Sequence, residues 1–179
     1  MPLRNTSLRY GSVAKTLHWL IFLLLISQVT FGYFLESIPK SMQAFSYNLH
    51  KLTGLLIFAL MVLRGLWALI NPKPLLPLST RLWEHLLERL VHFLLYFAIL
   101  AMALLGWVGS VAGGRPPHLG NFIFNLPITP SKSLASLAFE LHNAFAILII
   151  TLVSLHVIAA FFHYFIRKDK VLQSMLPGG

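Results

Sequence analysis

Long stretches without a charged side chain constrain this chain more than any other feature of its sequence. Asp, Glu, Lys and Arg are absent from residues 16–35, 90–114 and 141–166, and residues 52–70 contain only Arg64. A helix of about 20 residues crosses a hydrocarbon core roughly 30 Å thick, because each residue adds about 1.5 Å. The sequence therefore predicts one domain over residues 1–179, with four transmembrane helices at residues 16–35, 50–70, 90–112 and 141–166.

The composition agrees with a membrane protein and narrows its chemistry. Hydrophobic residues make up 57% of the 179 residues and charged residues 11%, against roughly 25% charged residues in an average soluble domain. The net charge of +9 therefore indicates basic membrane loops, and we expect no nucleic acid partner. Because the chain has no cysteine, disulfides, thiolate metal sites, iron–sulfur clusters and covalently attached c-type haem are excluded. The expected fold class is all-α, a membrane-embedded four-helix bundle.

Basic residues are unequally distributed between the two ends of this bundle. Ten of the 14 Lys and Arg residues lie in the amino-terminal segment, around the second connection or in the carboxyl-terminal tail, and four lie in the other two connections. Because basic loops stay in the cytoplasm, we expect both termini on the cytoplasmic side of a multi-pass protein.

Histidines are the main ionisable residues at membrane depth, where such side chains are costly and usually functional. His142 and His156 are 14 residues apart, which puts them on similar faces of one helix at heights that differ by about 21 Å. Because neighbouring helices run in opposite directions, His50 is expected at the height of His142 and His18 nearer the height of His156. The spacing predicts two facing pairs, His50 with His142 and His18 with His156.

Two facing imidazoles suit the axial positions of a low-spin b-type haem, which transfers electrons without binding oxygen. Zinc normally takes four protein ligands, or three and a water molecule. The pattern therefore predicts two haem b groups, an outer one and a cytoplasmic one. A lone helical histidine is more often a hydrogen-bonded packing residue, and a haem-free, histidine-lined transporter of protons or metal ions remains an alternative.

Two further histidines have two interpretations each. His163 follows His156 by two helical turns, where it can hydrogen-bond a quinone carbonyl or be an ordinary interfacial histidine. His92, near the cytoplasmic start of the third span, can compete with His18 as a ligand or pack in the bundle.

Three other residues lie near the expected haems. Arg64 and Lys15 are placed to neutralise haem propionates, although interfacial anchoring explains both equally well. Gly54, one turn after His50, leaves room for a flat macrocycle or for close helix packing.

The order of these residues resembles the bacterial cytochrome b-561 family of small diheme membrane proteins. The matching segments are Leu17-His18-Trp19-Leu20, His50 with Gly54 and Val62-Leu63-Arg64, His142 with Leu155-His156, and His163-Tyr164-Phe165 before Arg167-Lys168-Asp169. The resemblance implies a bacterial inner-membrane protein with two b haems, the four paired histidines as ligands and ubiquinone as redox partner. For stand-alone members it also implies superoxide oxidase activity, in which superoxide outside the membrane is oxidised to oxygen and ubiquinone is reduced.

The resemblance leaves a second role open. Related members are haem-bearing anchor subunits that pass electrons between quinone and a periplasmic hydrogenase or dehydrogenase. A basic outer surface is compatible with steering superoxide, although membrane-anchoring loops look similar. On that surface the basic residues Lys40, Lys51, Arg115 and Lys132 outnumber the acidic residues Glu36 and Glu140.

Overall fold

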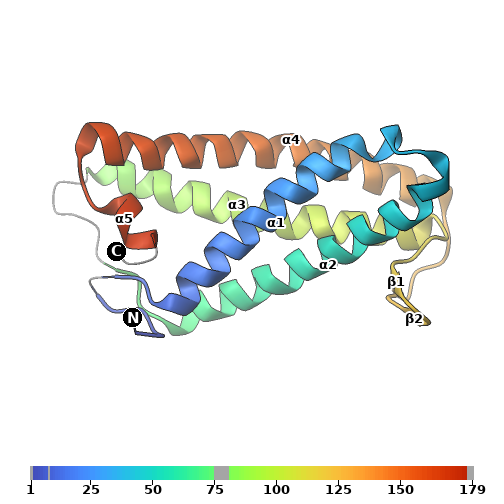
Figure 1. Ribbon diagram of the computed structural model, residues 1–179, viewed down its shortest axis with the longest axis horizontal. Helices are drawn as coiled ribbons and strands as arrows, with labels where there is room; N and C mark the ends of the chain where they lie inside the picture. The colour runs from blue at the N-terminus through green and yellow to red at the C-terminus, as the bar shows by residue number, and fades with distance from the viewer. Residues whose placement is uncertain (1, 8, 75–80, 177–179) are drawn as a thin grey trace.

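The structure is a computed structural model that describes residues 2–7, 9–74 and 81–176. Four long helices dominate the described part of the chain (Figure 1). They are α1 (Ser12–Phe34), α2 (Lys40–Ile70), α3 (Leu82–Ala112) and α4 (Lys132–Phe162). The shorter elements are the 3-10 turn η1 (Leu35–Ser37), strands β1 (His118–Leu119) and β2 (Phe122–Ile123), the π-helical turn η2 (His163–Arg167) and helix α5 (Val171–Met175). The predicted four-helix fold is confirmed.

Successive long helices run in opposite directions, so the bundle has two distinct ends (Figure 1). We call the end with residues 2–7 and α5 the terminal end, and the end with the β1–β2 hairpin the hairpin end. The two strands pair antiparallel, with His118 opposite Ile123. Gly120, in the turn between them, has a φ of 57°, a conformation that favours glycine. The expected placement of the terminal end in the cytoplasm stays a prediction.

The long helices extend beyond the charge-free stretches inside them, because capping and proline end a helix wherever the membrane boundary lies. At the start of α4 the Ser131 hydroxyl accepts a hydrogen bond from the Leu134 N–H at 3.3 Å. At the start of α3 the Glu84 carboxylate accepts one from the Arg81 N–H at 2.8 Å. Both contacts satisfy amide groups that a helix N-terminus leaves without a partner. Polar helical turns thereby extend from the apolar part of the bundle.

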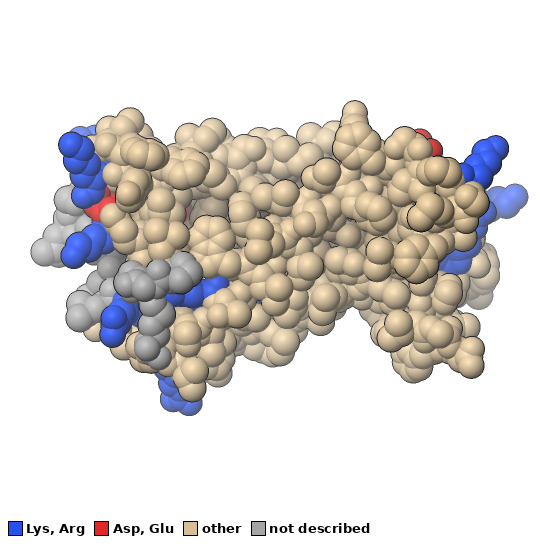
Figure 2. All heavy atoms as spheres, viewed as in Figure 1, with Lys and Arg blue, Asp and Glu red and all other residues tan. Residues whose placement is uncertain are grey.

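The outside of the bundle is apolar along its middle. Large hydrophobic side chains there remain exposed, among them Leu23, Phe97 and Ile150, which are 62%, 53% and 51% exposed. Lys and Arg side chains gather at the two ends and leave most of the middle free of charge (Figure 2). The four long helical segments have 18-residue windows with a mean hydropathy of 1.7 to 2.6. By length and composition, all four can span a membrane.

Some pairs of long helices pack closely, and others lie farther apart. A core of residues from all four helices, including Leu25, Met61, Ala98 and Ile149, fills the middle of the bundle. Helix α3 packs most extensively on α4, and α2 packs on both α1 and α3. Among the described residues, α1 and α4 make few close backbone contacts with each other, and so do α2 and α4. Side chains must fill the space between these helices, and histidines are prominent there.

Candidate functional site

Two pairs of imidazoles face one another across the spaces that α4 leaves toward α1 and α2. At the hairpin end, the ring centroids of His50 on α2 and His142 on α4 are 6.3 Å apart, with an angle of 69° between the rings. At the terminal end, those of His18 on α1 and His156 on α4 are 6.2 Å apart, at 62°. The structure therefore brings the four histidines together in the two combinations that their spacing predicts.

The separation within each pair is the one that two ligands of a single metal ion require. A metal-bound imidazole nitrogen lies roughly 2 Å from the ion and about 1 Å in front of its ring centroid, so two opposed rings have centroids about 6 Å apart. A histidine pair alone supplies too few ligands for zinc, which takes four protein ligands or three and a water molecule. The pairs therefore fit the axial positions of an iron porphyrin, whose macrocycle supplies the other ligands.

Hydrogen bonds at the histidines agree with this assignment. The Met102 carbonyl accepts a hydrogen bond from Nδ1 of His142 at 2.8 Å, so Nδ1 carries the proton and Nε2 keeps the lone pair that a metal needs. In contrast, the Nδ1 atoms of His18 and His50 are buried and have no hydrogen-bond partner among the described residues. Buried polar atoms rarely lack partners in folded proteins, so these two nitrogens distinguish His18 and His50 from His142, whose Nδ1 has a backbone partner.

Two glycines that the sequence analysis missed support the hairpin-end pair. A Cβ atom at Gly32 would lie 2.9 Å from Cε1 of His50, and one at Gly106 would lie 3.0 Å from Cε1 and Nδ1 of His142. Any larger residue would displace an imidazole. The available signal was that each glycine lies in an apolar helix at about the height of the pair.

Gly54, singled out beside His50, has a different neighbour. A Cβ atom there would meet only Nε2 of Gln28, at 3.8 Å. The buried Gln28 amide donates a hydrogen bond to the His50 carbonyl and so ties α1 to α2 at this level. Gly54 therefore lies where α1 and α2 pack together.

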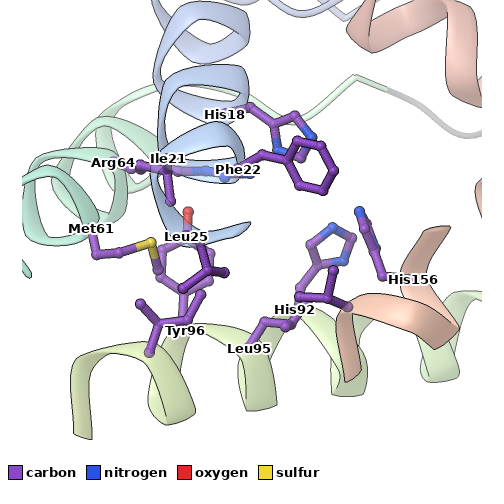
Figure 3. A pocket seen from close by; sticks show the side chains of 12 residues that line it. His18, Ile21, Phe22, Leu25, Met61, Arg64, His92, Leu95, Tyr96 and His156 are labelled. Atoms are coloured by element: carbon purple, nitrogen blue, oxygen red, sulfur yellow. The ribbon is translucent and has the colours of Figure 1, made fainter. Parts of the chain in front are cut away.

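The terminal-end pair borders an apolar cavity that is partly open. His18, His92 and His156 surround the same space, with Phe22 and Leu25 beside them (Figure 3). The ring centroids of His92 and His156 are 5.1 Å apart and the rings are at 79°. That separation is too short for two rings on opposite sides of one ion and fits edge-to-face packing. Nδ1 of His92 also bonds the Glu88 carbonyl oxygen at 2.7 Å.

The two cations predicted near haem propionates have different surroundings. Arg64 lines the terminal-end cavity, and its guanidinium carbon lies 5.6 Å from the centre of the Tyr96 ring. Lys15 is 4% exposed, and its Nζ donates a hydrogen bond to the Leu176 carbonyl at 2.8 Å. Lys15 therefore binds the chain segment after α5, whereas Arg64 lies where a bound group would meet it.

His163 lies in η2, outside the cavity of the terminal-end pair. Its Nδ1 is 2.6 Å from the Asp169 carboxylate, and both side chains are largely buried. Nearby, both carboxylate oxygens of Glu84 accept hydrogen bonds from Arg167 at 2.8 Å. The Arg167–Glu84 ion pair holds η2 against the start of α3, and the contact with Asp169 gives the His163 ring a fixed orientation.

Comparisons with known proteins point to one family. The family model described as prokaryotic cytochrome b561 matches residues 9–178. Cytochrome b561 homolog 2 of Escherichia coli is 31% identical over 185 residues, which cover 98% of this chain and 95% of that protein. Cytochrome b561 homolog 1 of the same organism is 26% identical over 184 residues, covering 94% of this chain and 97% of that protein. A probable superoxide oxidase of Yersinia pestis is 25% identical over 170 residues, covering 94% and 96%.

Proposed function

The chain belongs to the prokaryotic cytochrome b561 family of haem b-binding membrane electron-transfer proteins, and from that premise we propose that it oxidises superoxide at its hairpin end and reduces ubiquinone at its terminal end. The main observation behind this proposal is that two imidazole pairs lie at two levels of one bundle. Their ring centroids are almost equally far apart, 6.2 Å in one pair and 6.3 Å in the other. One haem held by a single pair would exchange electrons near one side of a membrane, whereas two haems held by stacked pairs would allow electrons to pass from one side to the other.

In this proposal His18 and His156 hold the haem b of the terminal end, and His50 and His142 hold that of the hairpin end. A bound haem supplies reversible one-electron chemistry at its iron. The chain would contribute one imidazole from each of two helices to each haem, and apolar side chains around the terminal-end pair would exclude water. With two histidines holding each haem, the bound iron would be suited to electron transfer and not to oxygen binding.

Basic residues beside the hairpin-end pair support an anionic electron donor. Lys51 follows His50 directly, and its Nζ donates a hydrogen bond to the Arg115 carbonyl at 2.7 Å. Cations at the mouth of a site raise the encounter rate with a small anion such as superoxide. In the overall reaction, two superoxide ions are oxidised to two oxygen molecules. One ubiquinone takes up the two electrons and two protons and becomes ubiquinol.

His163 is the proposed contact for ubiquinone. Because Asp169 binds Nδ1, the ring presents Nε2 to a ligand as the atom that can exchange a proton with a quinone oxygen. The proposed site lies at the terminal end, which we expect to face the cytoplasm, where protons are available.

The proposal is tested with purified protein in detergent. Sharp alpha and Soret bands on reduction, with two haems per chain, are expected first. Stopped-flow mixing with superoxide should then reduce the haems rapidly, and added ubiquinone should reoxidise them. Superoxide dismutase in the mixture is the control and should abolish the reduction. A two-haem protein that superoxide does not reduce would overturn the proposed substrate, and a colourless protein from haem-replete cells would favour the ion transporter.

The anchor-subunit role has one observation in its favour. The hairpin projects from its end of the bundle, and its Leu119 and Phe122 side chains are 66% and 64% exposed. Exposed apolar side chains of this kind suit contact with another protein. Copurification with a large periplasmic redox subunit, together with slow reduction by superoxide, would favour that role.

A further inference from the structure

A second cavity, also partly open, lies beside the cavity of the terminal-end pair. We call it the polar cavity, because its lining includes Arg64, Trp67, Asn71, Lys73 and Glu88. The two cavities share Arg64, His92 and Tyr96 as lining residues. Arg64 therefore lies at the boundary between the two cavities, where it can contact a ligand of either one.

Two buried polar atoms in the polar cavity lack hydrogen-bond partners among the described residues. They are the indole Nε1 of Trp67, which is a donor, and Oδ1 of Asn71, which is an acceptor. Nδ2 of Asn71 donates to the Trp67 carbonyl at 3.0 Å, so the orientation of the amide is set and Oδ1 is the atom left over. Asn71 is only 7% exposed. Leaving such atoms without partners is costly, so their presence indicates a bound polar group.

The charges of the polar cavity favour an anionic group. Arg64 and Lys73 contribute two positive charges to its lining, and Glu88 contributes one negative charge. Burial and the charge of Glu88 also raise the pKa of Tyr10, another lining residue, so its hydroxyl keeps a proton to donate. A carboxylate can accept hydrogen bonds from the indole and the guanidinium, and a water molecule bound to it can donate to Asn71.

We propose that the polar cavity binds the carboxylates of the haem held by His18 and His156, with the Trp67 N–H and the Arg64 guanidinium as donors. This inference rests on the proposed function, because it needs a haem between those two histidines. A haem between His18 and His156 would have apolar surroundings at the histidine pair and the polar cavity beside it for its two carboxylates. Lys15, the other predicted propionate partner, donates a hydrogen bond to the Leu176 carbonyl, so this proposal is built on Arg64 and Trp67.

The test compares two ligands in protein stripped of haem. One is haem b, and the other is its dimethyl ester, which has no carboxylate charge. The His142→Ala variant is used to leave only the terminal-end site, and His156→Ala to leave only the hairpin-end site. In His142→Ala the ester should bind at least about tenfold more weakly than haem, because hydrogen bonds to charged groups are strong. Adding Trp67→Phe should weaken haem binding about tenfold and leave the ester nearly unaffected.

Two controls make the result specific. Trp67→Phe should not change haem affinity in the His156→Ala background, because the polar cavity lies at the other end of the bundle. Trp83→Phe, at an indole that is 56% exposed at the start of α3, should change nothing in either background. Equal affinities for haem and its ester in His142→Ala would overturn this inference and leave the proposed function intact. Failure of the unaltered protein to bind any haem would overturn both.

Discussion

The two histidine pairs have almost the same separation but very different surroundings. At the hairpin end, Gly32 and Gly106 lie against the imidazoles, and the Met102 carbonyl sets the orientation of one ring. At the terminal end, the pair borders a cavity that shares Arg64 with a second, polar one, and His92 packs beside the pair. The hairpin-end site is shaped by backbone that packs closely on the imidazoles, whereas the terminal-end site is shaped by side chains that line a cavity. Substitutions should therefore disturb the two sites by different physical routes.

The largest expected effect separates the sites completely. We expect His142→Ala to remove the haem of the hairpin end and His156→Ala to remove that of the terminal end, because each iron would lose one axial ligand. Haem content, measured by absorption of the extracted pigment, should fall from two per chain to one in each variant. Two haems retained in either variant would reject the pairing. His85→Ala, outside both pairs, is the control.

The next effect concerns quinone at the terminal end. His163→Ala should keep both haems and slow ubiquinone reduction by about 100-fold, the usual size of a positioned acid or base. Asp169→Asn should give a smaller loss, because it removes the carboxylate at Nδ1 but keeps the imidazole. The measurement is stopped-flow reoxidation of reduced protein by ubiquinone. Unchanged kinetics in both variants would make His163 an ordinary interfacial residue.

Close packing at the hairpin end predicts an intermediate effect. Gly106→Ala would put a Cβ atom 3.0 Å from the His142 ring, and such overpacking typically costs about 1–3 kcal/mol. Haem affinity at the hairpin end should therefore fall about tenfold or more, without change at the terminal end. Gly65→Ala is the matched control, because its Cβ would meet only Tyr96 at 3.8 Å. Equal losses at both ends would mean that the glycine stabilises the whole bundle.

The features of the fold that were predictable depend on properties of single helices. Charge-free stretches show four membrane-spanning helices because charged side chains are costly in lipid. The rise and twist of an α-helix place His142 and His156 on one face at two heights, and alternating directions supply His50 and His18 as partners. These arguments need no knowledge of which helices are neighbours.

The features that escaped prediction depend on how helices sit beside one another. Gly32 and Gly106 gain their role only because α1 meets His50 and α3 meets His142 at those positions. The pairing of His163 with Asp169 depends on η2 and the chain reversal at Lys168, which has a φ of 54°. Trp67 and Asn71 have no distinguishing signal in the sequence, and only the structure shows that both line the polar cavity. The spacing of hydrophobic residues along a helix does not show which helices lie beside one another or how each helix is rotated toward its neighbours.

The smallest expected effect tests the charge of the hairpin end. Lys51→Gln should slow haem reduction by superoxide a few-fold at low ionic strength, because it removes a cation beside the hairpin-end pair. The difference should shrink as salt is added, since the screening length falls from about 30 Å at 0.01 M to about 3 Å at 1 M. Lys170→Gln, an exposed residue of the terminal end, is the control and should leave the rate unchanged. A loss in Lys51→Gln that persists in high salt would instead point to its hydrogen bond with the Arg115 carbonyl, and the lysine would then act by shaping the hairpin end.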